Sequence, residues 1–257
     1  MLEQQSEASP LLRSMALALM TLPFVFFVTP QQPWFWTTPG VLAAGMLLAR
    51  KIPTWRGHAL LWSVFAAALG LALPWPFSLI LPSALVLTLG RYLPSLREIA
   101  GKLRRGSLDR GTSGLAALIA VVSSGALWTW FVWGGADVSD MVALLPRRPL
   151  PVLLAGSLVF AIANATWEEL LMKWLVWDGV ERLVQSRGFV GVFQAALCGL
   201  LHLHGFPRGW LGVTLAGVYG LLLGALRARS GGLLALLITH ALADVTICLL
   251  LLSELAR

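Results

Sequence analysis

The sequence predicts an all-α protein, a polytopic transmembrane helix bundle of eight to nine spans. Two observations lead to this fold class. Hydrophobic residues make up 58% of the 257 positions and charged residues only 12%, about half of the ~25% that is typical of soluble domains. The apolar residues also gather into stretches that approach the ~20 residues needed to cross the hydrocarbon layer as a helix.

Nine apolar stretches follow one another along the chain. They cover residues 11–29, 35–49, 57–73, 77–93, 112–133, 151–177, 189–204, 210–226 and 232–252. Some are short or contain a proline, such as Pro23 and Pro82, and membrane helices tolerate proline where neighbouring groups satisfy the freed carbonyls. The prediction is therefore eight to nine spans in a single integral membrane domain over residues 1–257.

Positive charge is distributed unevenly over the connecting segments. With a cytoplasmic N-terminus, 14 of the 19 Lys and Arg residues lie in cytoplasmic segments, in agreement with the positive-inside rule. Two acidic residues precede the first base, Arg13, whereas a cleaved signal peptide begins with a basic stretch. We therefore expect an integral protein of the cell (inner or plasma) membrane that keeps its first span and has its N-terminus in the cytoplasm.

The net charge of +7 does not indicate a nucleic-acid partner. The basic residues alternate between connecting segments and do not cover one soluble face. The most basic stretch, residues 91–110, is expected to lie on the anionic cytoplasmic leaflet. The predicted partner of this charge is therefore the lipid bilayer.

The ionisable side chains that stand out inside the apolar stretches of the second half are Glu168, Glu169, His202, His240 and Asp244. A charge at the bilayer centre costs at least ~2.5–3.5 kcal/mol on insertion scales, so such residues usually serve a function. Carboxylates and imidazoles drawn from three helices are the groups of a water-activating hydrolytic site. Their position predicts scaffold helices over residues 1–148 and catalytic helices over 149–257.

Glu168 and Glu169 are expected to differ in role. Adjacent residues are about 100° apart around an α-helix, which predicts that the two carboxylates do not enter the same pocket. Glu169 and Lys173 are spaced i, i+4 with the acid first, the better order for a helical ion pair. We therefore predict that Glu169 and Lys173 support the site, while Glu168 faces the reacting groups as a general base. A buried structural ion-pair cluster is the alternative interpretation.

The histidines are expected to approach this base from two further helices. His202 and His204 are two residues apart, so in a helix they diverge by about 160° and only one of them faces Glu168. His240 and Asp244 are spaced i, i+4 and therefore share one helix face. At hydrogen-bond distance, the Asp244 carboxylate would fix the tautomer and orientation of the His240 imidazole.

At these residues the chain resembles the CPBP family of membrane-embedded proteases, which includes the Rce1-type CAAX prenyl endopeptidases and bacteriocin-processing or abortive-infection proteins. The family motifs are Glu-Glu-x-x-x-Arg, Phe-x-x-x-His and His-x-x-x-Asn/Asp on successive helices. The matching stretches here are residues 168–173, 198–202 and 240–244, and the similarity covers roughly residues 150–252.

The resemblance implies a glutamic endopeptidase that uses no metal. In the mechanism that the resemblance implies, Glu168 activates water, and His202 positions that water or stabilises the oxyanion. His240 and Asp244 polarise the scissile carbonyl. Two residues depart from the family pattern, since Lys173 replaces the arginine and Cys198 replaces the phenylalanine. Lysine lacks the planar fork with which arginine holds a carboxylate, so these departures are compatible with a divergent subgroup and with an inactive relative.

Two other functions use the same residue types. Two histidines with carboxylates match a zinc site that keeps one position open for water, although the chain contains no His-Glu-x-x-His helix. A transporter or a non-enzymatic immunity protein also keeps charges within the membrane. The preferred prediction is an intramembrane endopeptidase without a cofactor, whose partners are the bilayer and a membrane-tethered protein or peptide substrate.

Overall fold

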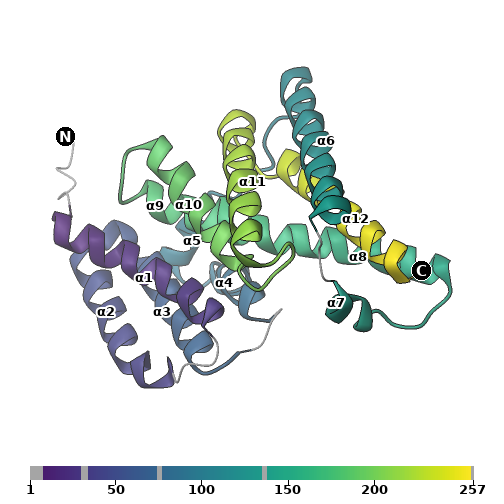
Figure 1. Ribbon diagram of the computed structural model, residues 1–257. Helices are drawn as coiled ribbons and strands as arrows, with labels where there is room; N and C mark the ends of the chain where they lie inside the picture. Colours follow the sequence, from purple (N-terminus) through teal and green to yellow (C-terminus); the bar gives the residue numbers. More distant parts are fainter. Residues whose placement is uncertain (1–7, 30–33, 74–76, 135–137, 256–257) are drawn as a thin grey trace. The chain divides into compact units, whose positions relative to one another are not determined.

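The computed structural model describes residues 8–29, 34–73, 77–134 and 138–255. Within these ranges every regular element is a helix (Figure 1), which confirms the predicted all-α class. The acidic N-terminal residues that entered the topology prediction lie outside the described residues.

The helices follow the predicted apolar stretches closely. They are α1 (Pro10–Val28), η1 (Trp34–Thr37), α2 (Thr38–Lys51), η2 (Pro53–Trp55), α3 (Arg56–Gly70), α4 (Phe77–Leu89), α5 (Pro94–Ala100), α6 (Arg110–Trp133), α7 (Ser139–Ala143), α8 (Leu150–Glu169), η3 (Leu170–Val176), α9 (Trp177–Glu181), α10 (Arg187–Leu201), α11 (Gly209–Ser230) and α12 (Leu234–Leu255). The short helices α5 and α7 were not predicted.

Among the described residues, five helical stretches are long and apolar enough to cross a bilayer. They are Pro10–Val28, Arg110–Trp133, Leu150–Glu181, Gly209–Ser230 and Leu234–Leu255. Helices α2, α3, α4 and α10 occupy predicted spans with only 13 to 15 residues, or roughly 20–23 Å against the ~30 Å of the hydrocarbon layer.

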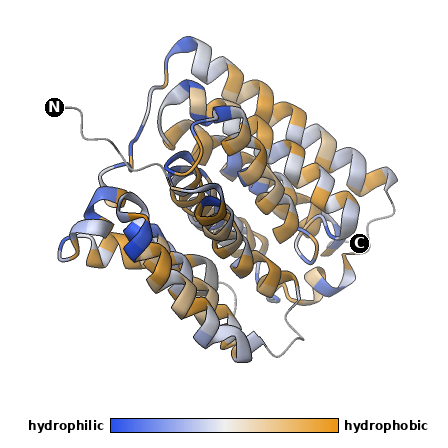
Figure 2. Cartoon of the chain, turned by 90° about the vertical axis from the view of Figure 1, so that its left-hand side faces the viewer, coloured by the Kyte–Doolittle hydropathy of each residue, from blue (hydrophilic) through white to orange (hydrophobic). Residues whose placement is uncertain are grey.

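The helices are apolar along most of their length, with many of the hydrophilic residues at helix ends and in connecting segments (Figure 2). This distribution and the five long stretches support an integral membrane protein. The predicted count of eight to nine spans is not confirmed.

The chain divides into two compact units, each made from two separate stretches. The first unit contains residues 1–103 and 170–221, and the second contains residues 104–169 and 222–257. The two adjacent glutamates, His240 and Asp244 all belong to the second unit. The predicted division into scaffold and catalytic helices concerns function and stays a prediction.

In the first unit, buried tryptophans fix the stretch that follows Glu169. Trp174 in η3 donates a hydrogen bond from Nε1 to the carbonyl oxygen of Ile99, at 3.0 Å. Trp55 donates from Nε1 to the carbonyl oxygen of Gly179, at 2.8 Å. Both tryptophans are at most 1% exposed, and a buried indole N–H requires such a partner. The stretch from η3 to α9 is therefore held to other helices of its own unit.

In the second unit, α12 packs against both α6 and α8. The buried residues of its first half recur at helical spacing and form one stripe, which consists of Ala235, Leu236, Thr239, His240, Ala243 and Asp244. Where α12 packs against α6, Ser124 Oγ of α6 lies 2.8 Å from Thr246 Oγ1 of α12. The polar members of the stripe are thus placed in a helix that is packed on two sides.

The N-terminus of α6 depends on Asp109. Its carboxylate accepts hydrogen bonds from the backbone N–H of Thr112 at 2.9 Å and from the hydroxyls of Thr112 and Ser107 at 3.0 and 3.1 Å. The bond from the Thr112 N–H is the main reason why the pKa of Asp109 is lowered to about 2. Asp109 therefore acts as an N-cap that stabilises the helix when it is ionised.

Replacing this cap is expected to give a pH-dependent loss of stability. Asp109→Ala should lower the Tm of the protein above pH ~4, where the carboxylate is ionised in both folded and unfolded chains. Because the folded pKa is the lower one, the Tm difference should shrink as the pH falls from ~4 towards 2. Thermal unfolding at stepped pH measures this, with Asp140→Ala as a control for loss of an acid. A difference that does not vary with pH would contradict the assignment.

Candidate active site

The helix that carries both glutamates changes its winding immediately after them. Helix α8 ends at Glu169, and residues Leu170–Val176 form the π-helix η3. A π-helix pairs residues i and i+5, and π-turns are frequent at functional sites. Lys173 therefore lies in a π-helix, where an α-helix was predicted. Lys173 is fully buried, it belongs to the first unit, and its ion pair with Glu169 stays a prediction.

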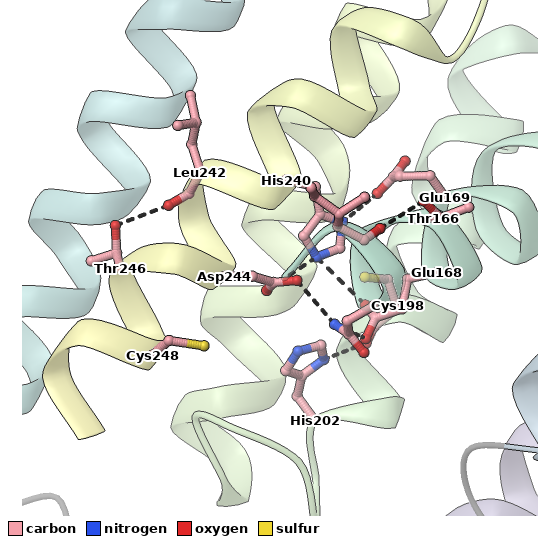
Figure 3. Close-up of polar contacts among 12 residues, drawn as sticks. Thr166, Glu168, Glu169, Cys198, His202, His240, Leu242, Asp244, Thr246 and Cys248 are labelled. Atoms are coloured by element: carbon pink, nitrogen blue, oxygen red, sulfur yellow. Dashed lines mark hydrogen bonds and ion pairs between the residues drawn. The ribbon is translucent and has the colours of Figure 1, made fainter. Parts of the chain in front are cut away.

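Both glutamates reach the same imidazole, that of His240 (Figure 3). Glu169 Oε1 lies 2.8 Å from His240 Nδ1, and Glu168 Oε2 lies 3.7 Å from His240 Nε2. The prediction that the two carboxylates point to different places is wrong. The backbone directions do diverge, but an imidazole offers a nitrogen on each of two edges, and two flexible glutamate side chains meet one edge each.

Glu169 is the residue that orients the imidazole. An ionised carboxylate can only accept, so at 2.8 Å the hydrogen of this bond is carried by His240 Nδ1. A carboxylate on one ring nitrogen fixes the tautomer and the direction of the other nitrogen. His240 Nε2 is consequently the nitrogen that faces Glu168 and Asp244.

Asp244 does share a helix face with His240, as predicted, but it does not make the predicted hydrogen bond. Asp244 Oδ1 lies 3.7 Å from His240 Nε2, which is beyond hydrogen-bond length. The short aspartate side chain must cross the ~5–6 Å that separates positions i and i+4 on a helix. Its other oxygen is also engaged elsewhere, by Asn164.

Asn164 is a member of the cluster that sequence reasoning missed. Its Nδ2 donates to Glu168 Oε1 and to Asp244 Oδ2, both at 3.1 Å. Asn164 precedes Glu168 by one helical turn, inside the same apolar stretch. The sequence did contain a signal for Asn164, because a polar amide inside an apolar stretch is costly and, like an ionisable residue there, usually serves a function.

The four ionisable side chains of this cluster differ in how far they are exposed to solvent. The side chain of Glu169 is 2% exposed, that of Asp244 7% and that of His240 9%, whereas Glu168 keeps 13%. Glu168 is thus the most accessible carboxylate and Glu169 the most buried. This order is compatible with the predicted roles, which remain predictions.

His202 lies outside the helix in which it was predicted. Helix α10 ends at Leu201, so His202 is its C-cap and His204 lies in the following turn. The predicted helix to residue 204 is therefore wrong, since Gly205 and Pro207 favour a turn here. His202 Nδ1 donates to the carbonyl of Cys198 at 3.0 Å, and His204 Nε2 donates to the carbonyl of Val28 at 2.8 Å.

His202 and Cys198 belong to the first unit. The place of His202 beside Glu168 and the role of Cys198 in a pocket wall accordingly stay predictions. The bond from His204 to α1 gives that histidine a structural contact of its own.

No set of three or more His, Cys, Asp and Glu side chains is arranged to hold a metal ion, as far as the structure describes the chain. Zinc as a cofactor stays the alternative prediction.

Residues 150–246 match the family described as type II CAAX prenyl endopeptidase Rce1-like. This region is Rce1-like. The match begins at the first residue of α8 and ends two residues after Asp244, so it contains the whole cluster.

The Rce1-like match confirms the resemblance to the CPBP family, and it supports a membrane endopeptidase. No curated protein and no solved structure matches the chain.

Proposed function

We propose that this protein is an intramembrane endopeptidase that cleaves a membrane-tethered or membrane-proximal peptide or protein, with water activated by Glu168 and without a metal. The observation that carries the proposal is the cluster of three carboxylates around one imidazole in the Rce1-like region. Glu168, Glu169 and Asp244 each have an oxygen within 3.7 Å of a His240 nitrogen.

The first step of the proposed reaction is attack by water. Glu168, as the most accessible carboxylate of the cluster, takes a proton from the water whose oxygen bonds to the scissile carbonyl carbon. In the protonated imidazole, Nδ1–H remains on Glu169 and Nε2–H is the donor for the oxyanion of the tetrahedral intermediate. His202 is proposed to position the water.

The second step breaks the peptide bond. When the tetrahedral intermediate collapses, the carbon–nitrogen bond opens and Glu168 returns its proton to the leaving amine. The products are a new carboxylate and a new amino terminus. Because the residues lie in apolar helices, the proposed substrate is one that the membrane itself brings to the site.

A comparison of membrane proteomes tests this proposal. Cells that express the wild type should contain amino termini that are absent with Glu168→Gln and present with the matched control Thr166→Val, which changes only a side chain bonded to its own helix. Repeating the cleavage of the identified site with purified protein and a zinc chelator should leave the rate unchanged.

Two outcomes would contradict it. Identical termini in wild type and Glu168→Gln would remove the proteolytic function and favour a transporter or immunity protein. Loss of cleavage with chelator, restored by stoichiometric zinc, would replace the metal-free mechanism with the zinc alternative.

A further inference from the structure

Asn164 closes a ring of side chains in the second unit. Its Nδ2 lies 3.1 Å from Glu168 Oε1 and 3.1 Å from Asp244 Oδ2. The remaining oxygen of each carboxylate, Glu168 Oε2 and Asp244 Oδ1, lies 3.7 Å from His240 Nε2. One amide group thus contacts two carboxylates on different helices, and both carboxylates approach the same ring nitrogen.

The orientation of the Asn164 amide follows from its neighbours. Ionised carboxylates only accept hydrogen bonds, and the side-chain NH2 of asparagine offers two hydrogens, one for each carboxylate. The reversed amide would place its carbonyl oxygen against two acceptors. The NH2 group therefore faces Glu168 and Asp244, and it is the donor that lets these two like charges lie in one place.

We propose that Asn164 is a positioning residue, which fixes the Glu168 and Asp244 carboxylates so that their second oxygens face His240 Nε2. This inference rests on the proposed function and adds to it a residue that does not touch the reacting atoms. Asn164 holds one oxygen of Glu168, and that restricts the carboxylate to a single direction for proton transfer. Its bond to Asp244 also joins α8 to α12.

Infrared spectroscopy of the purified protein tests the bridge without any substrate. The bands of the two carboxyl groups are assigned from Glu168→Gln and Asp244→Asn. In Asn164→Leu, which has a similar shape and no donor, both bands should shift together, whereas Thr166→Val should leave both in place. If Asn164→Leu does not give folded protein, Asn164→Ala is measured instead. A shift of neither band, or of only one, would overturn the bridge.

Cleavage kinetics test the positioning role. Asn164→Leu should lower kcat by about 10²-fold, the size of effect that misplacement of a reacting group can produce, and should change KM by less than about twofold. A wild-type kcat together with shifted bands would show that the bridge is merely structural and would overturn the inference. If Glu168→Gln retains full activity, the proposed function fails. The infrared bands still test whether Asn164 bonds to both carboxylates, because that measurement needs no substrate.

Discussion

Glu168→Gln is expected to lower kcat by about 10²- to 10⁴-fold, the contribution of a positioned general base. Glutamine keeps the shape of the side chain and can still accept the hydrogen bond from Asn164, but it cannot take a proton from water. Because the Glu168 side chain is the most exposed of the cluster, at 13%, the Tm should change little. Steady-state cleavage of a peptide that spans a site found in the membrane proteome measures the loss.

Glu169→Gln is the matched control, because it makes the same chemical change one residue along the chain. The side-chain oxygen of the introduced glutamine can still accept the hydrogen bond from His240 Nδ1, so the orientation of the ring is kept. We expect a loss of kcat of at most about tenfold, less than the loss from removal of a general base. Equal losses in the two variants would mean that the roles assigned to the two glutamates are wrong.

His240→Leu is expected to abolish cleavage and to destabilise the protein. The substitution removes the imidazole that lies against the Glu169 carboxylate, whose side chain is 2% exposed. Breaking a buried pair in this way costs about 3–5 kcal/mol in the free energy of unfolding. Unfolding in a denaturant series, read alongside the cleavage rate, measures both effects.

A double-mutant cycle separates the pair from its surroundings. If the cost comes from the carboxylate that stays buried, Glu169→Leu combined with His240→Leu should be more stable than His240→Leu alone. His204→Leu is the control, since it removes a histidine whose bond goes to the carbonyl of Val28 and should cost only about 1 kcal/mol. A double variant that is less stable than either single variant would contradict the assignment.

The fold class and most of the cluster could be predicted because ionisable side chains stand out in apolar stretches. The i, i+4 spacing placed His240 and Asp244 on one helix face, and the structure confirms it. Hydropathy also located the helices, but it did not resolve where they end. The helix before His202 was predicted three residues too long, because hydropathy does not register the turn that Gly205 and Pro207 introduce.

The details of the cluster were not accessible from spacing alone. Helical angles describe where a side chain leaves the backbone, and they say little about where the end of a glutamate arrives. For that reason the prediction that Glu168 and Glu169 do not enter the same pocket missed their shared contact with His240. Asn164 was missed because only ionisable groups were considered, although an amide without hydrogen-bond partners is also costly to bury in an apolar helix.

The π-helix after Glu169 also affects how relatives of this chain should be aligned. Between Leu170 and Val176 each turn takes up more chain than an α-turn, so a homologue that is one residue shorter here can have the same three-dimensional arrangement on either side. For such a shorter homologue, an alignment that forbids a gap at this place would pair Lys173 with the wrong position. Evolutionary comparisons of the motif should therefore let its length vary.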